Sequence, residues 1–174
     1  MHIRPAIPGD IAAITAIYDA IHTTEEQGLS TVGWIRGVYP TRQTAEASLA
    51  RGDLFVAEAD GQVVGAAIIN QQQVDVYQGA PWQHPAPDAQ VMVLHTLVIH
   101  PQAAGHGYAT QFVAFYEACA RAQGCPFLRM DTNARNTAAR ALYKKLGYAE
   151  IGIVPCVFNG IAGVQLVLLE KCLP

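Results

Sequence analysis

The fold is decided by the stretch Leu97-Val98-Ile99-His100-Pro101-Gln102-Ala103-Ala104-Gly105-His106-Gly107-Tyr108-Ala109. Its apolar start ends at a proline, polar or small residues follow, and a helical pattern begins at Tyr108, which predicts a strand, a tight loop and a helix N-terminus. The first backbone N–H groups of a helix have no intrahelical partner, and small residues let an anion approach them closely. The stretch therefore predicts a site for a phosphate or pyrophosphate, with an ordinary strand-to-helix turn as the alternative.

The chain after this loop continues to alternate helices and strands. Apolar residues recur at helical spacing after Tyr108, and Gly147 can end a second helix. A turn at Asn159-Gly160 joins two closing strands. The expected elements are a helix over 108–119, a strand over 127–131, a helix over 136–146, and strands over 148–157 and 164–170.

The chain before the loop favours two helices and a β-hairpin. Asp10 can cap a helix with an apolar stripe formed by Ile11, Ile14, Ile17, Tyr18 and Ile21. Thr41 can cap a second helix that ends before Gly52, and Asp60-Gly61 is a two-residue hairpin signal. The expected elements are a strand over 2–6, helices over 11–21 and 42–50, and strands over 53–59, 62–70 and 90–99.

The order of these elements predicts an α/β fold of the α+β type. Hairpins come first and a βαβ unit follows, so antiparallel and parallel pairs must occur in one mixed sheet. We expect about seven strands flanked by about four helices, which is the number of elements in this order. A chain of 174 residues suits a single domain over residues 1–174.

The composition excludes several classes of protein. Hydrophobic residues are 51% of the chain and charged residues 14%, which is typical of a globular domain rather than a disordered one. The net charge of −3 predicts no nucleic acid partner and no anionic membrane partner. There is no signal peptide, and the four cysteines lack the spacings of a metal site, so we expect a cytoplasmic protein without a metal.

A second group of candidate residues lies on the helix over 136–146. On a helical wheel Tyr143 falls within about 20° of Asn136, since seven residues nearly complete two turns. Both lie at the edge of the apolar stripe, and the small Ala139 lies between them. The Asn136 amide and the Tyr143 phenol thus lie on the same edge of the helix, beside the shallow surface at Ala139. A tyrosine half-buried at the edge of the core would produce the same pattern.

Two motifs in this order resemble the GNAT superfamily of N-acetyltransferases. Gln102-x-x-Gly105-x-Gly107 is similar to the family's acetyl-CoA signature, and Asn136-x-x-Ala139-x-x-x-Tyr143-x-x-x-Gly147-Tyr148 is similar to its second motif. The resemblance implies the GNAT fold, acetyl-CoA as cosubstrate, and loop amides that hold the pyrophosphate. The cofactor-binding residues that it implies are Leu97, Val98, Ile99, Gln102, Ala103, Ala104, Gly105, His106, Gly107, Tyr108, Ala109, Thr110 and Asn136.

The resemblance also implies two catalytic residues. Tyr143 matches the tyrosine that faces the thioester sulfur and could donate a proton to the leaving thiolate. His95 matches the second histidine of the arylalkylamine N-acetyltransferase strand, and Val93 replaces the first. His95 could therefore accept the proton of the amine, and a core histidine is the alternative. A backbone N–H near Val98, freed where the strand bulges, could stabilise an oxyanion.

The function implied is transfer of the acetyl group of acetyl-CoA to a primary amine of a small molecule or amino acid. Trp34 and Tyr39 could line the acceptor pocket, although core packing explains them equally well. One alternative is a catalytically weak acetyl-CoA sensor of the same fold. Another is a dinucleotide-binding domain, which the hairpins and Thr110 at the third glycine position disfavour. The oligomeric state stays open, and a homodimer is one option.

Overall fold

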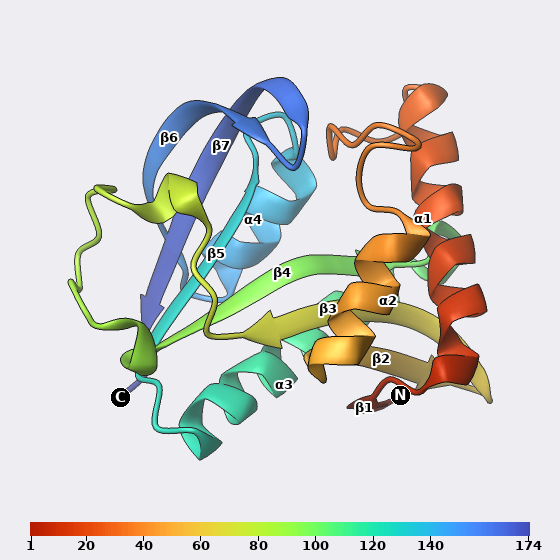
Figure 1. The fold of residues 1–174 in the computed structure, drawn as a ribbon, viewed down its shortest axis with the longest axis horizontal. Helices are drawn as coiled ribbons and strands as arrows, with labels where there is room; N and C mark the ends of the chain where they lie inside the picture. Colours follow the sequence, from red (N-terminus) through yellow and green to blue (C-terminus); the bar gives the residue numbers. More distant parts are fainter.

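The computed structural model describes residues 1–174 as a seven-stranded mixed sheet flanked by helices (Figure 1). The strand order is β1-β2-β3-β4-β5-β7-β6. The strands are β1 His2–Pro5, β2 Leu54–Ala59, β3 Gln62–Asn70, β4 Val91–Ile99, β5 Phe127–Asn133, β6 Ala149–Phe158 and β7 Ile161–Cys172. The α-helices are α1 Ile11–Glu26, α2 Arg42–Arg51, α3 Tyr108–Ala122 and α4 Thr137–Lys145. The predicted order of elements and the mixed sheet are confirmed.

The first half of the sheet is an antiparallel meander of β1 to β4. Its β2–β3 turn has Asp60 at φ 51° and Gly61 at φ 74°, the left-handed pair that a two-residue hairpin needs. Helices α1 and α2 cover one face of this half, and the apolar stripe of α1 packs there against β2 and β3. The Thr41 cap and the left-handed Gly52 occur as predicted.

Asp10 occupies the position before α1 as predicted, but its side chain does not cap the helix. The Asp10 carboxylate accepts hydrogen bonds from the Arg4 guanidinium, at 2.7 and 3.0 Å, and from the Ile7 backbone N–H, at 2.8 Å. It makes no capping bond to α1. An ionised carboxylate gains more from a bidentate arginine than from one orphan amide, so Asp10 joins the start of the helix to β1 instead.

The second half of the sheet joins the first through a short parallel pairing. β4 and β5 pair only from Val91–Phe127 to Leu94–Met130, and beyond these residues the strands diverge, as Figure 1 shows. β7 inserts between β5 and β6. Helices α3 and α4 cover the face of the sheet opposite to α1 and α2, around a core that includes Met92, Phe112, Tyr116, Leu128 and Leu169.

An irregularity in β4 lies at the point of divergence. Ala66 pairs with Val98 and Ile68 pairs with His95, so one residue of β3 lies opposite Thr96 and Leu97 of β4. This is a β-bulge, and it fits the expectation of an irregular strand near Val98. Thr96 has φ 50°, a left-handed conformation that a β-branched residue rarely adopts.

The long segment over 71–89 packs against the sheet rather than standing away from it. Tyr77 is buried with Val91, Val93 and Leu168 on the same face of the sheet as α1 and α2, over the part that these helices do not cover. None of the helices combines the length and the apolar character needed to cross a bilayer.

Candidate functional site

The loop before α3 leaves a run of backbone amides without partners. Pro101–Ala103 form a 3₁₀ turn, and Gly107 precedes the helix in a left-handed conformation and makes no side-chain cap. The N–H groups over 105–110 donate no hydrogen bond to any atom of the protein. Amides that no side chain caps, at the positive end of a 15-residue helix, suit a bound phosphate group.

The two glycines of this loop fit a closely approaching ligand. Gly105 has φ 84° and Gly107 has φ 75°, and a Cβ at either position would meet no protein atom within 4 Å. The space beside both is therefore open. His106 stacks on Tyr108 with 5.5 Å between ring centroids, and its Nδ1 lies 3.1 Å from the Ala104 carbonyl oxygen. This residue thus shapes the loop through its own contacts.

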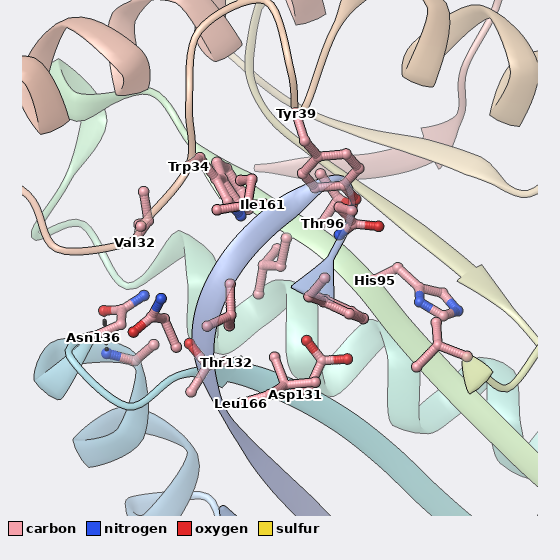
Figure 2. Close-up of a pocket in the computed structure, with 18 of the residues that line it drawn as sticks. Val32, Trp34, Tyr39, His95, Thr96, Asp131, Thr132, Asn136, Ile161 and Leu166 are labelled. Atoms are coloured by element: carbon pink, nitrogen blue, oxygen red, sulfur yellow. Dashed lines mark hydrogen bonds between the residues drawn. The ribbon is translucent and has the colours of Figure 1, made fainter. Parts of the chain in front are cut away.

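A cavity lies where β4 and β5 diverge, on the side of β4 that continues into this loop. The edge of β4 that faces β5 has no strand partner beyond Leu94, which includes the predicted cofactor-binding residues Leu97, Val98 and Ile99. A cavity of about 140 Å³ opens there, similar in size to one that holds benzene. Its lining comes from β4, β5, α4, the β6–β7 hairpin and the loop before α2 (Figure 2).

Asn136 and Tyr143 both line this cavity, with Ala139 between them, as the helical wheel indicated. Asn136 itself precedes the helix, where its side chain accepts a hydrogen bond from the Ala139 N–H at 3.2 Å, so the predicted helix start is one residue early. Tyr143 is 7% exposed, and its hydroxyl makes no hydrogen bond within the protein. Burial raises the pKa of Tyr143 above its usual value, with a further contribution from the charge of Asp131.

His95 lines the opposite side of the cavity from Asn136 (Figure 2). Its Nε2 lies 3.0 Å from Asn70 Oδ1, and the Asn70 amide donates to Asp53 Oδ2 at 2.8 Å. Because that amide orientation leaves an oxygen toward the ring, Nε2 carries the proton. Burial lowers the pKa of His95 to about 4, against a smaller upward contribution from the Gln72 backbone. His95 is therefore neutral at pH 7.

The two aromatic residues predicted for the acceptor pocket differ in position from two others, Tyr77 and Trp82. Trp34 and Tyr39 line the cavity, with an edge-to-face contact of 5.9 Å between their ring centroids, and the Tyr39 hydroxyl pairs with Thr96 on the bulge. Tyr77 and Trp82 do not line it. The Trp82 indole N–H donates to the Tyr77 carbonyl at 2.9 Å, and the ring lies under the Arg129 guanidinium at 4.0 Å.

Asp131 is the cavity residue that sequence reasoning missed. From the sequence, Asp131 is the end of a strand and the acidic residue that a dinucleotide-binding domain would use, yet its side chain lies in the middle of the lining, below Tyr39 and Thr96 (Figure 2). The Tyr77 hydroxyl donates to Asp131 Oδ2 at 2.7 Å. Burial raises the pKa of Asp131 to about 6, and the Tyr77 hydrogen bond opposes this.

Comparisons with solved structures find the same fold. An acetyltransferase of the GNAT family from Streptococcus agalactiae is 23% identical, with a TM-score of 0.82, over 99% of this chain and 95% of that one. A putative acetyltransferase from Salmonella typhimurium, solved with its cofactor acetyl-CoA, is 20% identical with a TM-score of 0.73, over 100% and 94%. A ribosomal-protein-alanine N-acetyltransferase from Brucella melitensis is 22% identical with a TM-score of 0.73, over 99% and 100%.

Sequence comparison gives the family directly. No curated protein matches the chain significantly. The family model described as "Acetyltransferase (GNAT) family" matches residues 14–148, which include most of α1, the unpartnered amides of the loop, the diverging strands and most of the cavity lining. The chain therefore belongs to the GNAT family of acetyltransferases.

Proposed function

We propose that the chain is an N-acetyltransferase that transfers the acetyl group of acetyl-CoA to a primary amine of a small molecule or amino acid, within a single domain. The observation that carries this proposal is the continuity of the site. Unpartnered amides over 105–110 lie at one end, the diverging edges of β4 and β5 follow, and a cavity lined by Tyr143 lies at the other end. The acetyl-CoA bound to the Salmonella typhimurium protein of the same fold supports it.

The loop and β4 would hold acetyl-CoA. The amides over 105–110 suit its pyrophosphate, since they have no competing partner. The free edge of β4 over 97–99 offers backbone groups to the amide-rich pantetheine arm, and Asn136 lies at the cavity end of the same opening. Gln102 to Ala104 shape the turn that brings the amides together.

Acetyl-CoA supplies an activated acetyl thioester, and the residues of the chain supply donors and a proton acceptor around it. Tyr143 holds a proton on its hydroxyl for the departing sulfur, because burial keeps the phenol protonated. A β4 backbone N–H near Val98 donates toward the acetyl oxygen. His95, unprotonated at neutral pH, accepts the proton of the amine directly or through water.

The acceptor would enter beside Trp34 and Tyr39. Both rings line the cavity, and with Ile161 and Leu166 they make its wall largely apolar. The chain carries a net charge of −3 and no basic run, which supports a small-molecule partner over nucleic acid.

An acceptor screen tests this function. The purified protein is incubated with acetyl-CoA and a panel of primary amines, and free thiol is followed. We expect thiol release that depends on the amine and that falls in Tyr143→Phe. Tight binding of acetyl-CoA without amine-dependent release, across the whole panel, would instead identify an acetyl-CoA sensor.

A further inference from the structure

Asp131 differs from every other acidic residue of the chain. Ten of the 14 acidic residues form ion pairs, and three more, Asp60, Asp75 and Asp88, are exposed to solvent. Asp131 alone is neither exposed nor paired with a cation. Asp131 is half-buried in the cavity wall, and a partly desolvated carboxylate without a counter-ion is costly, so a cationic ligand in the cavity would offset the cost.

One oxygen of this carboxylate is available to such a ligand. Tyr77 donates its hydroxyl proton to Oδ2, which orients the group, while Oδ1 accepts no hydrogen bond from the protein. The residue lines the cavity and projects under Tyr39 and Thr96 (Figure 2). A donor that enters the cavity therefore meets a free, oriented carboxylate oxygen.

The rest of the cavity restricts what that donor can be. None of the lining residues is a lysine or arginine, and Asp131 is its one acidic residue. Val32, Trp34, Ile161, Val164 and Leu166 provide apolar surface around it. Arg135 lines an adjoining hollow, where its side chain is 67% exposed and lies 3.6 Å from Glu25. An anionic group placed beside Asp131 would thus have no cationic partner.

We propose that Asp131 binds the ammonium group of the acceptor, and that the cavity selects primary amines with an apolar substituent and no carboxylate on the carbon next to the nitrogen. This inference rests on the proposed acetyltransferase function and narrows its substrate class. A simple alkylamine is cationic in neutral solution, so the charge complementarity acts on the form that predominates. An α-amino acid would bring a second carboxylate next to Asp131 without a counter-ion, which disfavours it. Recognition of the ammonium form precedes its deprotonation, so this role is separate from the one proposed for His95.

Three ligands of the same shape test the inference on the unaltered protein. 3-Methylbutylamine carries the ammonium group, 3-methylbutanol replaces it with a neutral hydroxyl, and leucine adds the α-carboxylate. Each is titrated calorimetrically into the complex of the protein with CoA, which cannot react. We expect the amine to bind at least tenfold more tightly than both the alcohol and leucine.

Variants then assign the effect to one carboxylate. Asp131→Asn keeps an acceptor for the Tyr77 hydroxyl and removes the charge. We expect it to weaken amine binding at least tenfold, to leave alcohol binding unchanged, and to raise the KM for the amine more than it lowers kcat. Asp75→Asn removes an exposed charge from the same segment as Tyr77. It should change neither the affinity for the amine nor the KM for it.

Several outcomes would overturn the inference. They are equal binding of the amine and the alcohol, binding or turnover of leucine as good as that of the amine, or unchanged amine affinity in a folded Asp131→Asn variant. The comparison of the three ligands uses the unaltered protein, so it tests the inference even if the Asp131→Asn variant does not fold. Amine-selective binding without any thiol release would contradict the proposed function and leave this inference standing. Efficient thiol release with leucine would support the proposed function and contradict this inference.

Discussion

At the residue scale, Tyr143 and Tyr148 carry the same ring in different surroundings. Their rings meet edge to face at 6.2 Å in the core below the cavity. The Tyr148 hydroxyl donates to Glu117 at 3.1 Å, whereas the Tyr143 hydroxyl has no partner in the protein and lines the cavity. The Tyr143 hydroxyl is therefore free to donate to a ligand in the cavity, whereas the Tyr148 hydroxyl is occupied by Glu117.

Removing each hydroxyl separates the two roles. Because a positioned proton donor contributes about 10²–10⁴-fold to rate, we expect Tyr143→Phe to lower kcat by a factor in or somewhat below that range. Its affinity for acetyl-CoA and its melting temperature should stay unchanged, since no hydrogen bond is lost. Tyr148→Phe is the matched control and should keep kcat. A Tyr143→Phe variant with full turnover, where chemistry limits the rate, would remove Tyr143 from the mechanism.

His95 should make stability depend on pH. Its pKa is about 4 in the folded chain and about 6.5 when unfolded, so the unfolded state binds more protons as the pH falls. Protonation of His95 therefore leaves the free energy of unfolding nearly unchanged above pH 6.5 and lowers it progressively as the pH falls from 6.5 toward 4. We expect the wild type to lose about 2 kcal/mol more than His95→Gln between pH 7 and 5. Urea unfolding at the two pH values measures this, and equal losses would show that His95 titrates normally.

At the element scale, helix α3 has a left-handed glycine at each end. Gly107 precedes it at φ 75° and Gly124 follows it at φ 68°, and a Cβ at either would meet no protein atom within 4 Å. The backbone strain of a substitution is therefore similar at both ends. Only Gly107 lies beside the unpartnered amides, so the two positions separate strain from ligand binding.

We expect Gly107→Ala and Gly124→Ala each to lower the melting temperature by a few degrees, since a non-glycine residue in this region costs about 1–2 kcal/mol. Gly107→Ala should also weaken CoA binding at least tenfold, because the methyl group occupies the space that a phosphate would use. Calorimetry with CoA compares the two variants. Equal CoA affinity in both would place the pyrophosphate elsewhere.

The elements that follow from local chemistry were predictable, and those that depend on distant contacts were not. The hairpin at Asp60-Gly61 and the Thr41 cap need only neighbouring residues. Asp10 was assigned wrongly because its partner, Arg4, competes from a strand. The placement of Thr96 on the bulge depends on the register between β3 and β4. The hydrogen bond that orients Asp131 comes from Tyr77, 54 residues earlier in the chain. No local sequence pattern predicts either relation.

At the scale of the whole molecule, the sheet consists of two halves joined by four residue pairs between β4 and β5. The candidate cosubstrate site lies where these halves separate, with the amides over 105–110 on one side and Asn136 on the other. The motifs predicted this arrangement only through their resemblance to a family. Physically, the open edges left by the divergence are what allow an amide-rich ligand to pair with the sheet.

A ligand that bridges the two halves should stabilise both. At 100 times its Kd, CoA adds about 2.7 kcal/mol to the free energy of unfolding, which for a chain of this size raises the melting temperature by about 5–10 °C. We expect slower amide hydrogen exchange in the diverging parts of both β4, over 95–99, and β5, over 131–133. Gly107→Ala at the same CoA concentration should reduce both effects, because it weakens the anchor of the same ligand. Protection confined to the loop over 102–110 would contradict a bridging site, since pyrophosphate binding alone orders that loop without linking the halves of the sheet.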